Sequence, residues 1–402
     1  MHDVKFTLLN RNETTNFGRV VTYANAADVE IPPPLVVGAP DLLRSETRVK
    51  IHRTRNVHFP SVEYFSMERA TLIGQCLVVS ESGESVLDTI IPHRQASYGI
   101  KTAGKAMCGM PQKSTREVGG LTLVLPVDAP SMSHFLFEGL PHLIVGIPDI
   151  ENVVIGTSPH QGFSDLISFA LGKRVNILFR PPELYEESLL LERALVPIYH
   201  FNFHPTMAVQ LENIVAACRG KDTETSGYLY ISRQDATNYR MMLNEDRIAL
   251  LMRAIGFEVL ELKSMMEIDI VRKFSSAKMI VGPMGAGLYN CIFSPPGCIV
   301  LALCSPNYLR SFLYQCAALR GIRMAFCFGP DFLSYEEGQQ GGNNDFVIDE
   351  DMVLETVLSL LEEAGNVSTA QMLRQKPAPP VPESRPSLGL FRQILRRKIT
   401  PP

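Results

Sequence analysis

The sequence predicts an α/β protein whose N-terminal part is rich in strands and whose C-terminal part is a doubly wound domain. Two observations support this prediction. Short alternating stretches separated by turn residues, such as GLTLVLPVD, fill residues 38–128 and are typical of strands. After residue 129, continuous apolar runs alternate with amphipathic segments, and this alternation indicates a parallel sheet covered by helices.

The alternation is clearest in the C-terminal half of the chain. Strands are predicted at residues 227–233, 257–262, 278–282, 298–303 and 322–329. Helices are predicted between and after them, at residues 244–256, 265–277, 285–294, 308–321 and 349–365. A domain wound in this way binds its ligands beyond the carboxyl ends of its strands, so the residues that follow each strand are the first candidates for a site.

Changes in composition divide the chain into four predicted parts. Residues 1–37 form an irregular lead-in, residues 38–205 and 206–365 form two domains, and residues 366–402 form a Pro-rich, basic tail that is expected to be disordered. The last piece of the tail, from Phe391 to Lys398, has an apolar face beside four cations. A membrane-surface anchor and a solvated tail both remain open for it.

The composition excludes several classes of protein. With a net charge of −4 and 20% charged residues, the chain is not predicted to coat nucleic acid. No stretch approaches the length of roughly 20 apolar residues that a bilayer requires. The first residues also lack the apolar run of a secretory signal, so a cytoplasmic protein is predicted.

The eight cysteines show no metal-binding pattern. None forms a C-x-x-C pair, and no histidine stands at zinc-finger spacing from them. Five follow residue 290, inside an apolar region where a cysteine most often serves as a small core residue. We therefore predict reduced cysteines and no metal site.

A glycine-rich stretch, GPMGAGLYNCIFSPPG at residues 282–297, follows a predicted strand and opens a predicted helix. At such a turn glycine lets backbone amides approach an anion, and the helix N-terminus contributes about half a positive charge. Between Asp269 and Asp331 the chain has six Lys or Arg residues and no acidic residue. The stretch therefore predicts a phosphate site, while a plain packing turn remains the alternative.

A nicotinamide cofactor fits this stretch poorly. A dinucleotide-binding turn needs an acidic residue about 20 residues further on, which binds the ribose hydroxyls. No acidic residue is within that reach. A phosphate-bearing ligand without that ribose contact fits better.

The second stretch, YISRQDATNYRMMLNED at residues 230–246, begins in a predicted strand. Arg233 follows the strand directly, where a guanidinium can bind a pair of phosphates. Arg240 is expected within a turn or two of helix from Arg233. Asn244 is predicted to cap the next helix, with acidic residues in the first turn. Two cationic strand ends in one parallel sheet indicate a phosphate crevice.

The third stretch is SHFLFEGLPHL, in which His134 and Glu138 stand four positions apart. On a helix this spacing puts both side chains on one face, about 6 Å from each other. An imidazole beside a carboxylate can take a proton from a hydroxyl. A histidine satisfied by the first turn of a helix is the alternative reading.

Together the three stretches resemble glycosyltransferase family 61, the DUF563-type enzymes of bacterial capsule and exopolysaccharide clusters. The first stretch matches the family's pattern at His134, Glu138, Leu140 and Pro141. The second matches at Tyr230, Ile231, Ser232, Arg233, Ala236, Asn244 and Glu245, with Arg240 one position late. The third matches almost throughout, but Met284 stands where the family has a histidine, and Phe135 replaces a tryptophan of the first block.

The resemblance implies a GT-B architecture, in which two Rossmann-like domains face a cleft. Residues 38–205 would then be the acceptor-side domain and residues 206–365 the domain that binds a nucleotide sugar. The implied reaction is inverting transfer of a hexosyl or pentosyl unit to a hydroxyl of a growing polysaccharide or a lipid-linked glycan. Enzymes of this architecture generally need no metal or other cofactor, and the acidic triplet Asp349–Asp351 is read as the start of a helix rather than a metal-binding motif.

The resemblance also implies roles for individual residues. Glu138 or His134 would be the catalytic base, with Glu138 preferred. The donor would be bound by the side chains and amides of Ser232, Arg233, Arg240, Met284, Gly285, Ala286, Gly287 and Asn290. Because Met284 replaces the family's histidine, a second hypothesis is a non-catalytic module that binds glycans or nucleotides. The basic tail would allow a peripheral contact with the inner face of the membrane.

Overall fold

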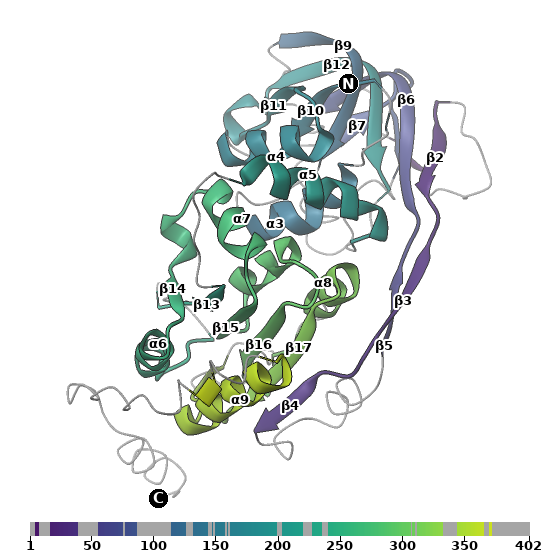
Figure 1. Ribbon diagram of the computed structural model, residues 1–402. Coiled ribbons are helices and arrows are strands. Elements are labelled where there is room, and N and C mark those ends of the chain that lie inside the picture. The colour runs from purple at the N-terminus through teal and green to yellow at the C-terminus, as the bar shows by residue number, and fades with distance from the viewer. Residues whose placement is uncertain are drawn as a thin grey trace, which may run out of the picture.

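The protein is a mixed α/β molecule built on two large sheets, one above the other in Figure 1. The computed structural model describes residues 5–7, 17–38, 55–74, 77–86, 114–125, 132–143, 147, 149–156, 159, 161–198, 203–219, 227–234, 240–306, 308–309, 312–332, 344–365 and 370–371. Within these residues no helix is both long and apolar enough to cross a bilayer.

The first sheet has seven strands. They are β2 (Arg19–Ala24), β6 (Val62–Ile73), β7 (Leu77–Val79), β9 (Ser114–Leu125), β10 (Ile150–Ile155), β11 (Asn176–Phe179) and β12 (Glu187–Pro197). Their order is β11-β10-β9-β12-β6-β2, with β7 paired to the free end of β6. The first four strands run parallel, and β6 and β2 are antiparallel additions. The predicted strand-rich N-terminal part is confirmed.

Two helices cover this sheet, α4 (Gln161–Leu171) and α5 (Ala208–Cys218). Apolar residues of α4 recur at helical spacing, and Phe163, Leu166 and Ala170 are buried with Leu123 of β9 in one core cluster. The apolar stripe of the helix therefore decides which of its faces packs on the sheet.

The second sheet has six parallel strands in the order β14-β13-β15-β16-β17-β4. Five of them are β13 (Tyr228–Ile231), β14 (Glu258–Leu260), β15 (Met279–Pro283), β16 (Ile299–Cys304) and β17 (Arg323–Phe328), all at predicted positions. The helices between them are α6 (Glu245–Ala254), α7 (Glu267–Ser275), the 3₁₀ helix η8 (Ala286–Phe293), α8 (Phe312–Arg320) and α9 (Glu350–Glu363).

Helices lie on both faces of this second sheet. Successive strand residues alternate between two cores, as Ile280 belongs to the core cluster of α7, η8 and α8, and Val281 to that of α6 and α9. Strands buried on both faces read as continuous apolar runs, and this explains the run KMIV and the run CIVLAL. The predicted doubly wound domain is confirmed. The predicted helix at residues 285–294 differs in type, because it is a 3₁₀ helix.

The prediction of an irregular lead-in at residues 1–37 is wrong for residues 5–7 and 17–37, which include strands. β2 pairs with β6 of the first sheet, β3 (Ala27–Ile31) pairs with β5 (Arg55–Phe59), and β4 (Leu35–Gly38) joins the second sheet beside β17. Three consecutive prolines between β3 and β4 make the sequence look irregular, because proline has no backbone N–H to donate to a neighbouring strand. This segment runs along both sheets as the strap on the right of Figure 1.

The remaining elements are short. They are β1 (Lys5–Thr7) paired with β8 (Glu84–Val86), β18 (Asp331–Phe332) paired with β19 (Asp345–Phe346), and the single turns η5 (Pro182–Leu184), η6 (Pro205–Met207) and η7 (Leu262–Ser264). The predicted tail, residues 366–402, lies outside the described residues apart from 370–371. The predicted domain boundaries stay predictions.

The cysteines that follow residue 290 are core residues, as predicted. Cys291, Cys298, Cys304, Cys316 and Cys327 are all buried. Burial in apolar surroundings raises the pKa of the thiols of Cys298 and Cys327 to about 12. These thiols therefore stay protonated at neutral pH and pack as small apolar groups.

His204 fastens the strap to the start of α5 and is expected to make stability pH-dependent. Its Nε2 donates to the Asn25 carbonyl at 2.8 Å, and its Nδ1 accepts from the Thr206 amide at 3.2 Å. Burial lowers the pKa of His204 below its ordinary value of 6.5. The folded state thus favours the neutral ring, whose stabilisation is complete above the ordinary pKa and is lost as the pH falls through the lowered one.

Urea unfolding at pH 7.5 and pH 5.5 measures this effect. We expect the unfolding midpoint of the native protein to fall with pH, and the fall to be smaller in His204→Gln. His58→Gln is the comparison variant, because His58 is exposed on β5, where its Nδ1 lies 2.9 Å from Oδ1 of Asp28. An equal fall in His204→Gln would show that other groups cause the pH dependence.

Candidate donor site at the carboxyl edge of the second sheet

Two of the predicted stretches meet where β13 and β15 end. These strands are parallel neighbours, so the residues that follow them lie side by side. Nη1 of Arg233 donates to the Met284 carbonyl at 3.4 Å. A Cβ on Gly285 would lie only 3.2 Å from Cδ and Nε of Arg233. The arm of Arg233 therefore lies directly against the backbone of the glycine-rich turn, as a shared phosphate site requires.

A buried carboxylate fixes the turn that carries Arg233. Glu245, in the first turn of α6, accepts the Arg233 amide at 2.5 Å and the Ser232 hydroxyl at 3.1 Å. The Ser232 oxygen also accepts the Gln234 amide at 3.2 Å. The hydroxyl of Ser232 is thus engaged within the turn, and it shapes the backbone next to Arg233.

Arg240 joins the same cluster, but not from a helix. Its backbone carbonyl accepts a second bond from Nη1 of Arg233 at 3.4 Å. Its φ of +57° is left-handed, a conformation that costs a non-glycine residue about 1–3 kcal/mol. The expectation of a helix from Arg233 to Arg240 is wrong where the structure is described, because Arg240 and Met241 have no regular structure.

The conformation of Arg240 is held from outside the stretch. The Met241 amide donates to Oδ1 of Asp345 at 2.8 Å, and the Phe346 amide donates to the Met241 carbonyl at 2.9 Å. On the side-chain end, Cζ of Arg240 lies 4.1 Å from the centroid of the Tyr308 ring, a cation–π contact. Surrounding structure of this kind is what a strained backbone needs to persist.

Asn244 occupies the predicted N-cap position, but its side chain does not cap α6. Instead, its amide group donates to the Ile348 carbonyl at 2.7 Å and accepts the Ile348 amide at 3.2 Å. The side chain thus bonds both backbone groups of Ile348, as a neighbouring strand would, and it links residue 244 to the segment just before α9. The prediction of a side-chain cap is wrong for this reason.

The glycines of the turn divide into two kinds. A Cβ on Gly282 would lie 2.7 Å from the Ile231 carbonyl oxygen, and a Cβ on Gly287 would lie 2.8 Å from Cγ2 of Ile231. These two glycines let β15 and η8 approach β13, so the alternative of a packing turn is correct for them. Gly285 instead faces Arg233, and Ala286 is exposed.

Gly282→Ala is expected to destabilise the protein by about 1–3 kcal/mol, because its Cβ meets a backbone atom that cannot rotate away. The free energy of unfolding in urea measures this. Gly119→Ala is the matched control in β9, because its Cβ would meet only an ordinary contact at 3.6 Å from Glu192. An unchanged unfolding free energy in Gly282→Ala would contradict the close approach of β15 to β13.

The backbone amides of η8 start at this turn. Leu288 donates the first bond of the turn, to the Gly285 carbonyl at 3.2 Å, so the amides of Ala286 and Gly287 precede it. Asn290 stands one turn further and is buried. Its Nδ2 donates to the Gly287 carbonyl at 3.0 Å, while its Oδ1 has no hydrogen-bond partner among the described residues. A buried acceptor in this state is able to receive a donor from a ligand.

Met284 contributes its backbone rather than its side chain. Its carbonyl accepts Arg233, and its amide donates to the Leu303 carbonyl at 2.8 Å. The side chain is 3% exposed and belongs to the core cluster of α7, η8 and α8. Met284 therefore helps to position Arg233 through its backbone carbonyl, and its side chain adds no polar group to the site.

The first stretch reaches the same region. It forms α3 (Met132–His134), the π-helical turn η3 (Phe135–Gly139) and the 3₁₀ turn η4 (Leu140–His142), and α3 packs against η8. A π-helical turn is rare and occurs frequently at functional sites. His134 is half-buried, and the side chain of Glu138 lies outside the described residues. The spacing of the two side chains therefore stays a prediction.

Four of the six Lys and Arg residues between Asp269 and Asp331 do not gather at the site. Arg272 pairs with Asp269 at 2.6 Å, Lys273 pairs with Glu258 at 2.7 Å, and Arg323 pairs with Glu363. Lys278 precedes β15 and lies at the opposite, amino edge of the sheet. The expectation that this segment supplies a basic patch around the turn is therefore wrong for these four residues. Three of them are paired with acidic residues from outside the segment, and Lys278 lies at the edge of the sheet opposite the turn.

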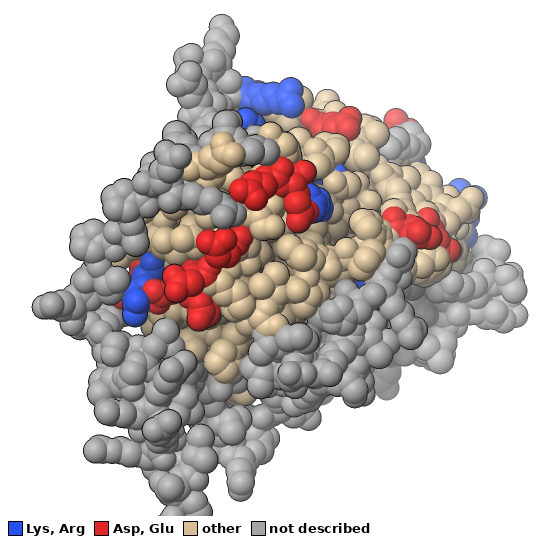
Figure 2. Space-filling view, turned by 60° about the horizontal axis from the view of Figure 1, so that its bottom comes forward, with Lys and Arg blue, Asp and Glu red and all other residues tan. Residues whose placement is uncertain are grey.

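The acidic triplet starts α9, as predicted. Oδ1 of Asp349 accepts the Met352 amide at 2.9 Å as an N-cap, and Glu350 pairs with Arg247 at 2.7 Å. Figure 2 shows acidic side chains across the middle of the face seen from below, the end of the molecule where α9 lies. Among the described residues, no three His, Cys, Asp or Glu side chains are placed to hold a metal ion.

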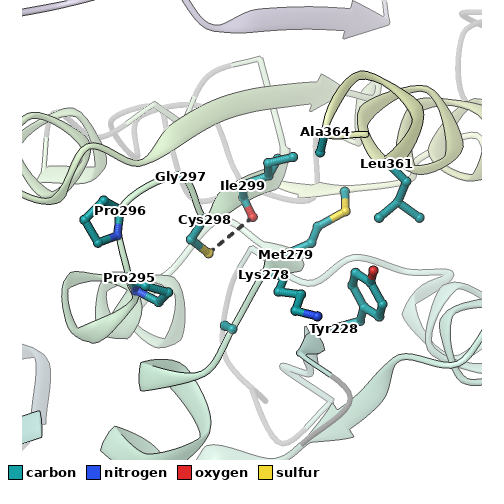
Figure 3. A pocket seen from close by; sticks show the side chains of 11 residues that line it. Tyr228, Lys278, Met279, Pro295, Pro296, Gly297, Cys298, Ile299, Leu361 and Ala364 are labelled. Carbon is teal, nitrogen blue, oxygen red and sulfur yellow. Dashed lines mark hydrogen bonds between the residues drawn. The ribbon is translucent and has the colours of Figure 1, made fainter. Parts of the chain in front are cut away.

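Two cavities lie at the amino edge of the second sheet, away from this site. One, of about 230 Å³, is lined by Tyr228, Lys278 and Met279 at the strand starts and by Leu361 and Ala364 at the end of α9 (Figure 3). The other, of about 290 Å³, lies between the three prolines of the strap and Met324 of β17. Neither adjoins Arg233.

Sequence reasoning missed two contributors to the site. The sequence predicts Glu245 in the first turn of a helix and matches it to the family's pattern, but it does not show that its carboxylate bonds the Arg233 turn. No sequence motif indicates Tyr308, although it follows β16 by four positions. The rule that ligands bind beyond the carboxyl ends of parallel strands would have directed attention to Tyr308.

A doubly wound parallel sheet with an arginine and a glycine-rich turn at its carboxyl edge is typical of Rossmann-like proteins that bind phosphorylated ligands. Residues 132–301 match the family model of glycosyltransferase 61, and this similarity supports a transferase. The matched range contains all three stretches, and Tyr308 and α9 lie beyond it. No curated protein matches the chain.

Proposed function

We propose that the protein is an inverting glycosyltransferase that moves a hexosyl or pentosyl unit from a nucleoside-diphosphate sugar to a hydroxyl of a polysaccharide or lipid-linked glycan. The observation that carries the proposal is the position of Arg233 against Gly285, at the joint carboxyl end of β13 and β15. A guanidinium and a glycine backbone at this place form a site for a diphosphate.

The donor side would act by charge. Arg233 would bind two phosphate oxygens, and the amides of Gly285, Ala286 and Gly287 at the start of η8 would add a fixed positive dipole. Arg240 would supply a second cation, and Oδ1 of Asn290 would accept a hydroxyl of the donor. These groups stabilise the charge that develops on the departing diphosphate, which is the larger part of catalysis in such a transfer.

The acceptor side would supply a base. As the acceptor oxygen attacks the anomeric carbon, Glu138 takes its proton and the diphosphate leaves from the opposite face, so the configuration inverts. His134 is the alternative base, or the group that orients the sugar. The packing of α3 on η8 supports this assignment, because it brings the first stretch to the helix that the glycine-rich turn opens.

Neither a metal nor another cofactor is needed in this proposal, since side chains and a helix terminus balance the leaving-group charge. The arrangement would be of the GT-B type, with the first sheet on the acceptor side. A lipid-linked acceptor would be met on the cytoplasmic side of the membrane, where the basic tail could make a peripheral contact.

A thermal-shift screen of the purified chain against nucleoside diphosphates and nucleotide sugars tests the proposal. We expect one base to raise the melting temperature, equally with EDTA and with added Mg²⁺. A rise only with Mg²⁺ would contradict metal independence. No rise with any nucleotide would contradict the donor site.

A non-catalytic glycan- or nucleotide-binding module is the second candidate, and Met284 favours it. The buried methionine leaves the site without the polar side chain that the family's pattern has at this position. If this candidate is right, nucleotides bind but no sugar is transferred or hydrolysed, and Met284→His gains turnover. If the enzyme proposal is right, the native protein turns over and Met284→His gives no gain.

A further inference from the structure

Tyr308 lies at the carboxyl end of β16, beyond the residues that match the family model. Its amide donates to the Ser305 carbonyl at 3.1 Å, so a tight turn holds it directly after the strand. The residue is 9% exposed, and Cζ of Arg240 lies 4.1 Å from its ring centroid. An aromatic face at this distance attracts a guanidinium and limits its position.

Arg240 is therefore held at three points. Its carbonyl accepts Nη1 of Arg233, the next residue is bonded to Asp345 and Phe346, and its guanidinium lies over Tyr308. The third contact acts on the charged group. Without the ring, the backbone of Arg240 would keep its place while the guanidinium gained rotamer freedom.

We infer that Tyr308 is a positioning residue that holds Arg240 as the second cation for a diphosphate. The inference rests on the proposed function. Arg233 supplies one planar fork beside Gly285, and Arg240 joins the same cluster through its own carbonyl. A cation already fixed by the ring needs no ordering when the anion binds, so the ring contributes to affinity without touching the ligand.

The experiment uses the full chain and inorganic pyrophosphate, which probes the diphosphate contacts whatever the base and sugar are. Calorimetric titration at constant salt gives the dissociation constant. Tyr308→Leu is expected to weaken binding about fivefold, and Tyr308→Phe, which keeps an aromatic face, to restore it. Tyr228→Leu is the matched control, because Tyr228 lies at the amino edge of the same sheet.

A double-mutant comparison separates positioning from a general effect on folding. If Tyr308 acts through Arg240, then Tyr308→Leu has no further effect in an Arg240→Ala background. Arg240→Lys leaves the tyrosine intact and is also expected to weaken binding, since an ammonium lacks the planar group. This variant carries the test if Tyr308→Leu does not fold.

The outcomes distinguish the inference from the proposed function. Additive losses in the double variant, equal losses in the Phe and Leu variants, or full affinity in Arg240→Lys would each overturn the role of Tyr308. Suppose that the native chain binds pyrophosphate, that Arg233→Ala abolishes this binding, and that Tyr308→Leu does not weaken it. The donor site is then supported, and the inference about Tyr308 fails. If the native chain binds no pyrophosphate, both fail.

Discussion

Arg233→Ala is expected to weaken nucleoside-diphosphate binding about 100-fold, because hydrogen bonds to charged groups contribute more than neutral ones and this residue supplies two of them. The substitution should change stability little. The carbonyl contacts of Arg233 are long, at 3.4 Å to Met284 and to Arg240. Titration with the diphosphate of the base found in the thermal-shift screen measures the loss.

Arg253→Ala is the matched control, since Arg253 is exposed at the end of α6, one helix away from the turn. It should bind the diphosphate as the native protein does. Equal affinity in Arg233→Ala and the native protein would remove Arg233 from the donor site. A loss in both variants would show that the net charge of the domain, rather than a defined site, attracts the anion.

Glu138→Gln is expected to lower kcat by about 100- to 10,000-fold while leaving donor affinity unchanged, as loss of a general base does. The amide keeps the size of the side chain but cannot take the proton. Transfer, or donor hydrolysis, is measured with the nucleotide sugar found in the screen. Donor affinity comes from titration with the same nucleotide.

His134→Ala separates the two candidate bases. A large loss of kcat in His134→Ala with full activity in Glu138→Gln would make His134 the base. Full activity in both variants would contradict the acceptor-side assignment. Glu183→Gln is the control, because Glu183 is an exposed carboxylate in η5.

The strands and helices of the second sheet could be predicted closely because their signals are local. Apolar runs such as that of β16 mark strands buried on both faces, and the stripe of α6 repeats at helical spacing. The strap could not be predicted in this way. β4 is four residues long, follows three prolines, and becomes a strand only because β17 offers it a free edge.

The candidate site divides similarly. Arg233, Gly285 and Asn290 could be found from their positions after strands and from the family's pattern. The prediction from the basic segment was wrong, because the sequence gives the number of charges but not the acidic side chains that pair with them. Arg272 and Lys273 are bound to carboxylates that precede the acid-free segment, at Asp269 and Glu258.

By itself, the sequence determined the doubly wound order, the glycine-rich turn and the resemblance to the family, since each of these depends on patterns of consecutive residues. Only the tertiary structure decided which groups meet at the site. Arg240 takes a left-handed backbone against its own preference, because Asp345, distant in the chain, bonds the next residue, and Tyr308, also distant, lies against the guanidinium of Arg240. A contact between residues far apart along the chain depends on how the elements pack, and neither segment carries a local sequence pattern that predicts it.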